Sequence, residues 1–205
     1  MPINKIISEG DARILVWELT ESFEELKLRL SGIHKKKLKK FSSEKRKLEY
    51  LCVRVAMKEL LGKETLIEYD NDGKPYLADK SAQISISHSK SWIAVMVHPS
   101  KSVGLDIECP TDKIGKIYTR FLNEAEQKEL SNGHNISQLQ LAWSAKETLY
   151  KIIGKDAVDF STQLQIFSFE VKTMGEITAQ HIPAKKLYQL HYIQQLAYNL
   201  VYCVD

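Results

Sequence analysis

The sequence WIAVMVHPSKSVGLDIE, residues 92–108, contains two short apolar runs separated by a polar linker. Trp92–Val97 and Val103–Ile107 each have the length and the β-branched content of a strand. His98–Ser102 lies between them and contains a proline among polar residues, which is typical of a loop. We therefore expect the boundary between two parts of the chain in this linker.

Helix and strand signals lie on both sides of the linker. Before it, Ser22 and Glu25 have the spacing of a capping box, and apolar residues between Ser43 and Gly62 repeat with the period of a helix. The sequence predicts helices at 22–30, 43–62, 123–133 and 137–154, further strands at 13–17, 67–69, 84–87, 163–171 and 196–204, and a turn near Gly175. This order predicts an α+β fold made of two α+β halves.

The composition excludes several classes of protein. The chain has 205 residues, of which 43% are hydrophobic and 27% charged, so we expect a buried core rather than disorder. Its longest apolar run, Trp92–Val97, is far shorter than the ~20 residues of a membrane helix, and residues 1–10 do not resemble a signal peptide. Lys and Arg number 29 against 26 Asp and Glu, which argues against a dedicated nucleic-acid binder. Cys52, Cys109 and Cys203 lack metal-binding spacing, which favours reduced thiols in a cytoplasmic protein.

Two acidic residues alternate with apolar ones at the end of the strand at 103–108. Since alternate residues of a strand share a face, Asp106 and Glu108 lie on one face, ~7 Å apart along the strand. Such a pair can converge on one hard cation. Gly104 lies on the same face, and we expect it to leave room for a ligand. The alternative is an edge strand whose acidic residues face water.

The helix predicted at 137–154 contains the sequence WSAKETLYK, residues 143–151. Trp143, Glu147 and Lys151 are spaced four residues apart and therefore share one face of this helix. Taken alone, Glu147 and Lys151 form an ordinary surface pair. A role in a site becomes the better interpretation if Glu147 supplies a third carboxylate near the acidic strand.

Two further motifs contain residues suited to phosphate. Lys74 lies in the turn GKP, residues 73–75, and His88 lies in SISHS, residues 85–89. Alternation also places His88 on the same face as Ile84 and Ile86, so a buried, hydrogen-bonded histidine is the alternative.

Residues 34–47 contain eight Lys or Arg and one Glu. Such a run is usually a solvated surface. It could also contact nucleic acid, a phosphorylated cofactor or an acidic protein surface. The run lacks the interleaved aromatic residues of a single-strand nucleic-acid platform.

Taken in order, five motifs resemble those of Sfp-type 4′-phosphopantetheinyl transferases over about residues 40–154: GKP (73–75), SISHS (85–89), VGLDIE (103–108), RFLNEAE (120–126) and WSAKETLYK (143–151). The resemblance implies two similar α+β halves packed as a pseudo-dimer, with the site between them. It implies a Mg²⁺-dependent enzyme of the holo-[acyl-carrier-protein] synthase type. Such an enzyme moves the phosphopantetheine arm of coenzyme A to a serine of an apo acyl or peptidyl carrier protein and releases 3′,5′-ADP.

The same resemblance implies a role for each matched residue. Asp106, Glu108 and Glu147 would be the metal ligands, and Glu147 and Lys151 the catalytic residues. Residues expected to contact coenzyme A are Arg46, Arg54, Gly73, Lys74, Pro75, Ser87 and His88. The first half, 1–100, would then hold the coenzyme A phosphates, and the second, 101–205, the metal. Thr148 stands where the family often has a smaller residue. The resemblance favours a monomer that binds neither membrane nor nucleic acid.

Two other functions remain open on the sequence. A metal-dependent nuclease could use the same three acids, but the lysine expected two residues after the second acid is Pro110 here. A non-catalytic module could bind coenzyme A or a carrier protein without needing three acids. The sequence also leaves open which carrier protein is modified, whether the metal is Mg²⁺ or Mn²⁺, whether acylated coenzyme A is accepted, and whether Glu147 acts directly or through water.

Overall fold

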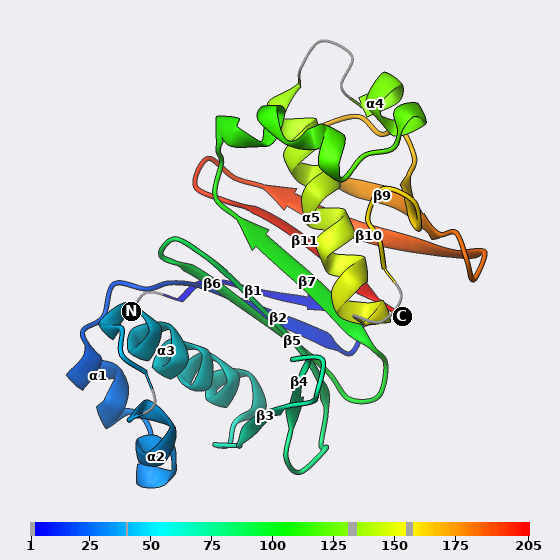
Figure 1. Ribbon diagram of the computed structural model, residues 1–205. Coiled ribbons are helices and arrows are strands. Elements are labelled where there is room, and N and C mark those ends of the chain that lie inside the picture. Colours follow the sequence, from blue (N-terminus) through cyan, green and yellow to red (C-terminus); the bar gives the residue numbers. More distant parts are fainter. Residues whose placement is uncertain (1–2, 40, 131–134, 155–157) are drawn as a thin grey trace. The chain divides into compact units, whose positions relative to one another are not determined.

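Two units make up the chain, Met1–Lys101 and Ser102–Asp205, in a computed structural model that describes residues 3–39, 41–130, 135–154 and 158–205. Each unit combines antiparallel strands with one long helix (Figure 1). The prediction of an α+β fold with two sheet-based halves is confirmed. Within the described residues, no helix is both long enough and apolar enough to span a membrane.

The first unit contains a four-stranded sheet covered by a long helix. Its elements are β1 (Ile3–Glu9), β2 (Ala12–Glu18), α1 (Phe23–Leu28), the 3₁₀ turn η1 (Gly32–His34), α2 (Lys35–Leu38), α3 (Glu44–Leu61), β3 (Ile67–Tyr69), β4 (Pro75–Leu77), β5 (Gln83–Ser89) and β6 (Trp92–His98). The sheet has the order β1-β2-β6-β5, and β3 and β4 form a separate hairpin. α3 begins after Ser43 and ends at Gly62, whose φ of 68° is the left-handed conformation that favours glycine.

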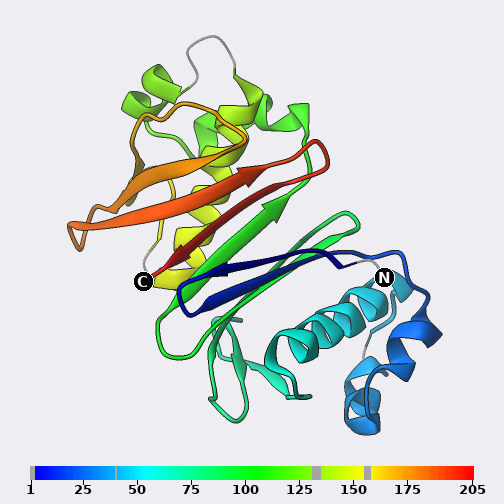
Figure 2. The same ribbon diagram turned by 180° about the vertical axis from the view of Figure 1, so that it is seen from behind.

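The second unit contains a five-stranded sheet. Its elements are β7 (Val103–Glu108), the 3₁₀ turns η2 (Asp112–Lys116) and η3 (Tyr118–Arg120), α4 (Glu124–Leu130), α5 (Ile136–Ile153), β8 (Leu164–Ile166), β9 (Met174–His181), β10 (Lys186–Gln194) and β11 (Asn199–Val204). The strand order is β7-β11-β10-β9-β8, and every pair is antiparallel. α5 covers one face of this sheet, which the view from behind shows with the strands in front of the helix (Figure 2).

Gly104 allows α5 to lie directly on β7. A Cβ atom at this position would stand 2.4 Å from the carbonyl oxygen of Thr148 and 2.7 Å from Cγ1 of Ile152. The expectation that Gly104 leaves room for a ligand is therefore wrong, because the helix takes that space. The same contact places the Gly104 face of β7, which also bears Asp106, against α5.

Several predicted boundaries differ from the structure. The strand predicted at 163–171 is limited to β8, and β1, β4, β9 and β10 have no predicted counterpart. Gly175 is not in a turn but in β9, where a Cβ atom would stand 2.7 Å from the hydroxyl oxygen of Tyr192. Its small size accommodates the tyrosine ring. The N-cap of α5 is Asn135 rather than Ser137, and its side chain accepts a hydrogen bond from the backbone N–H of Gln138. The predicted end of the preceding helix near Gly133 lies outside the described residues.

Candidate functional site

Asp106 and Lys151 form an ion pair between β7 and α5. The Lys151 ammonium donates to Asp106 Oδ1 at 2.9 Å and to the Leu105 carbonyl at 2.8 Å. Asp106 is 4% exposed, so its carboxylate is held in a mostly dry environment. Glu147 lies one helical turn before Lys151 and shares its face of α5. The structure thus brings the predicted acidic strand and the predicted helix face together.

Glu147 has an unusual acidity for a glutamate. Burial raises the pKa of Glu147 from 4.5 to about 7, and the charges of Asp106 and Glu108 act in the same direction, while Lys151 opposes them. Glu147 therefore feels the charges of two other carboxylates and of only one ammonium group. This excess of negative charge would favour a bound cation or a retained proton.

The donor set fits a hard divalent cation such as Mg²⁺, which prefers carboxylate oxygens. In the part of the chain that the structure describes, no three His, Cys, Asp or Glu side chains stand close enough together to hold a metal ion as they are. One oxygen of Asp106 already accepts a hydrogen bond from Lys151. The chemistry of Asp106, Glu108 and Glu147 therefore fits a metal, although the three carboxylates are not arranged around a common point.

The face of α5 that packs on the sheet differs from the Glu147 face. Thr148 is buried and donates from Oγ1 to the carbonyl oxygen of Val201 in β11, at 3.2 Å. The hydroxyl at this position thus attaches the helix to the sheet.

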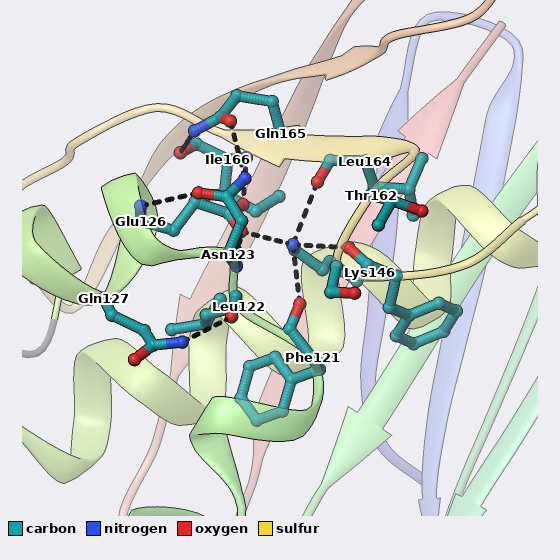
Figure 3. Close-up of polar contacts among 12 residues, drawn as sticks. Phe121, Leu122, Asn123, Glu126, Gln127, Lys146, Thr162, Leu164, Gln165 and Ile166 are labelled. Atoms are coloured by element: carbon teal, nitrogen blue, oxygen red, sulfur yellow. Dashed lines mark hydrogen bonds and ion pairs between the residues drawn. The ribbon is translucent and has the colours of Figure 1, made fainter.

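Lys146, the residue before Glu147, lies in a cage of oxygen atoms (Figure 3). Its ammonium is 2.7 Å from Glu126 Oε2, and it also donates to the carbonyls of Phe121, Phe160 and Leu164 at 2.7–3.0 Å. Both members of the ion pair are 0% exposed. Burial lowers the pKa of Lys146, and the Glu126 carboxylate opposes that effect.

The Glu126 carboxylate has further partners that fix it in place. Oε1 accepts from the backbone N–H of Ile166 at 2.6 Å, and Oε2 accepts from that of Asn123 at 2.8 Å. Lys146 and Glu126 thus attach α5 to α4 and β8, so they position the helix that presents Glu147. The sequence alone did not indicate this role for either residue. The available signal was the position of Lys146 between apolar residues at helical spacing, where a surface lysine is not expected.

Arg46 and His88 lie together in the first unit. Arg46 Nη1 is 3.3 Å from His88 Nε2 and donates to Glu49 Oε2 at 2.9 Å. His88 is exposed, so the alternative of a buried histidine is wrong. Ile84 belongs to the core and Ile86 only partly packs against it, so His88, two residues further, extends beyond the core on that face.

The GKP motif continues from a tight turn into β4. The Asp70 carboxylate accepts from the backbone N–H groups of Asp72 and Lys74, at 3.0 and 2.8 Å. Gly73 has a φ of 81°, which favours glycine. Pro75 begins β4, which packs beside β5, the strand that carries Ser87 and His88. Ser87 is buried next to the exposed histidine.

Arg54 is in the interior of the first unit. Its guanidinium lies 3.6 Å from the centre of the Tyr50 ring and donates to the Tyr50 carbonyl at 3.3 Å. It is 4% exposed, and its Nε and Nη2 have no hydrogen-bond partner among the described residues. The predicted contact with coenzyme A would require a ligand to reach this buried position.

The basic run at 34–47 is partly neutralised by acidic side chains. Lys47 pairs with Glu44 at 2.6 Å, and Lys45 lies 3.8 Å from Glu49, which also binds Arg46. Lys37 donates to a backbone carbonyl, and Lys40 lies outside the described residues. The run is therefore not a continuous surface of free charge.

Comparison with known proteins gives two matches. Residues 102–203 match the sequence model of a family described as the 4′-phosphopantetheinyl transferase superfamily. A Haemophilus influenzae protein named "Putative 4′-phosphopantetheinyl transferase" is 28% identical over a 141-residue alignment, which covers 60% of this chain and 59% of that protein. The chain thus matches only part of the length of this relative.

Proposed function

Because the chain belongs to the 4′-phosphopantetheinyl transferase superfamily, through residues 102–203, we propose that it is a phosphopantetheinyl transferase. It transfers the phosphopantetheine arm of coenzyme A to a serine of an apo acyl or peptidyl carrier protein and releases 3′,5′-ADP. The observation that carries this proposal is the interaction of Asp106, Glu108, Glu147 and Lys151 inside the matched region.

Asp106, Glu108 and Glu147 are the residues that would hold Mg²⁺. When bound, the cation supplies positive charge to the pyrophosphate of coenzyme A, which favours departure of 3′,5′-ADP. Lys151 contributes a second positive charge at the same place. Its attachment to Asp106 and to a backbone carbonyl fixes the ammonium in advance, so little reorganisation is needed during transfer.

Glu147 is the proposed proton acceptor for the carrier serine. A base works best when its pKa is near the working pH. Burial raises the pKa of Glu147 to about 7 in the metal-free protein, and a bound cation would lower it. It accepts the proton directly or through one water molecule.

The first unit supplies the proposed contacts to the nucleotide half of coenzyme A. Exposed His88, with Arg46 beside it, is suited to a phosphate group. The remaining proposed contacts are Ser87, Arg54 and the GKP residues Gly73, Lys74 and Pro75. We further expect a cytoplasmic monomer, and the three buried cysteines, which form no disulfide among the described residues, are compatible with a reducing compartment.

One experiment tests the proposed function directly. The protein is incubated with coenzyme A, Mg²⁺ and an apo carrier protein, and the intact carrier is weighed by mass spectrometry. We expect a mass gain of one phosphopantetheine group, which is absent with a carrier whose acceptor serine is alanine. Coenzyme A binding without any mass gain on acyl or peptidyl carriers would indicate a binding module, and Mg²⁺-dependent cleavage of DNA would indicate a nuclease.

A further inference from the structure

A pocket of about 580 Å³ with a mixed polar and apolar lining opens in the second unit, at the end of β7 where Glu108 lies. Its lining comes from residues 110–112 after β7, the first turns of α5 (Ile136, Ser137 and Gln140), Thr173, residues 194–196 after β10, and Asn199. Among the described residues, Asp112 is the only charged residue of this lining, and none of them contributes a basic side chain to it. A pocket of this mixed composition suits an uncharged ligand with both polar and apolar groups rather than a phosphate.

Asn199 is the buried polar group of this pocket. It is 1% exposed, and its carboxamide oxygen has no hydrogen-bond partner among the described residues. Gln140, also in the lining, differs because its amide donates to the carbonyl of Cys109 at 2.7 Å. A buried acceptor without a partner is unfavourable in the free protein, and a ligand that brings an N–H or O–H group would satisfy it.

The pocket is directly beside the candidate acidic site. Asn199 in β11 lies opposite Glu108 in β7, as Val201 lies opposite Asp106. Residues opposite each other in an antiparallel pair project to the same face, with Cβ atoms ~4.5–5.5 Å apart. A molecule whose phosphate is held at the carboxylates could therefore continue into the pocket without crossing the sheet.

We propose that this pocket binds the pantetheine arm of coenzyme A, with Asn199 accepting a hydrogen bond from an amide N–H of the arm. The inference rests on the proposed function. The arm is an uncharged chain with two amides, a hydroxyl and a dimethyl group, and it begins at the phosphate that is transferred. The lining matches it with amide side chains, hydroxyl groups, and the apolar side chains of Ile136 and Leu196.

Calorimetric titration with coenzyme A and with 3′,5′-ADP tests this proposal, since only coenzyme A carries the arm. Asn199→Leu removes the acceptor at similar volume. Leu196→Trp adds bulk at a fully exposed position of the lining, where loss of folding is not expected. Both variants should weaken coenzyme A binding about five- to tenfold, the value of one neutral hydrogen bond or a few lost contacts, and leave 3′,5′-ADP binding unchanged. Gln180→Leu in β9, outside the pocket, is the matched control and should leave the affinities for both coenzyme A and 3′,5′-ADP unchanged.

The other outcomes overturn the proposal in distinguishable ways. If the variants lose affinity for coenzyme A and 3′,5′-ADP equally, or lose affinity for neither, the pocket does not hold the arm. If Asn199→Leu weakens coenzyme A binding only in the presence of Mg²⁺, Asn199 is a metal ligand instead. Unchanged coenzyme A binding with a raised KM for the carrier protein would assign the pocket to that partner. If the wild-type protein binds neither coenzyme A nor 3′,5′-ADP, the proposed function fails, and the pantetheine site fails with it.

Discussion

Replacement of Glu147 by Gln should make the protein more stable at alkaline pH and leave its stability at pH 4.5 nearly unchanged. Well below pH 4.5 this carboxyl is protonated in both the folded protein and the unfolded chain, and at pH 4.5 it is ionised in only half of the unfolded molecules. Between pH 4.5 and 7 the unfolded chain loses the proton and the folded protein retains it, so the free energy of unfolding falls as the pH rises. Well above pH 7 the carboxyl is ionised in both states, and the free energy of unfolding no longer falls because of this group. The amide side chain of the variant cannot ionise and avoids this loss.

The size of the effect follows from the pKa of the folded protein. Raising the pKa from 4.5 to about 7 corresponds to about 3 kcal/mol at 25 °C. Water reaches part of the Glu147 side chain and screens its interactions, so we expect the variant to exceed wild type by about 1–3 kcal/mol at pH 8.

Urea denaturation at several pH values between 4.5 and 8, in the presence of a metal chelator, measures this difference. Glu129→Gln, at an exposed position of α4, is the matched control and should follow the wild-type pH profile. If Glu147→Gln also follows that profile, or is less stable than wild type at pH 8, burial and the neighbouring carboxylates do not raise the pKa of Glu147 as the structure indicates.

Four other variants test separate parts of the structure. Mg²⁺ should raise the melting temperature of the wild-type protein at pH 8 but not that of Asp106→Asn; an equal rise in both would exclude Asp106 as a ligand. Lys146→Met should lower the free energy of unfolding by about 3–5 kcal/mol, because Glu126 stays buried without its cation, and adding Glu126→Gln should recover part of this loss. Gly104→Ala should cost about 1–3 kcal/mol in chemical denaturation, because the new methyl group meets the backbone of α5; an unchanged midpoint would contradict that close packing. His88→Ala should weaken coenzyme A binding about tenfold in calorimetry and leave 3′-dephospho-coenzyme A unaffected, and an equal effect on both would exclude contact with the 3′-phosphate.

The long helices could be predicted because their signals are local. Ser43 and Gly62 bound α3 as predicted, and the apolar period of residues 137–154 identifies α5 apart from its cap. The strands of the tail depend on their neighbours instead. Gly175 has the composition of a turn, but its place in β9 is decided by the ring of Tyr192. No local pattern contains that information, because the two residues pair across a hairpin.

The sequence identified the residues of the candidate site but did not show how they are arranged in space. Periodicity alone places Asp106 and Glu108 on one face of a strand and Glu147 and Lys151 on one face of a helix, but it does not show that these faces meet. Their contact depends on how α5 packs on β7. Asn199 could not be predicted as a neighbour of this site, because its position opposite Glu108 depends on the register of β11 against β7.

The pairing of β7 with β11 has a consequence for how the protein is made. Glu108 and Asn199 are ladder partners 91 positions apart in the chain. A ribosome adding ~5–20 residues per second needs roughly 5–20 s to synthesise that interval. During this time Leu105 and Ile107 have been made, but β11, which later pairs with their strand, has not. All four strands of the sheet in the first unit lie before Ser102. That sheet can therefore form while β7 is still unpaired on the nascent chain. The proposed activity would therefore require that β11 has been synthesised, and until then chaperones would meet the second unit with an unpaired strand edge.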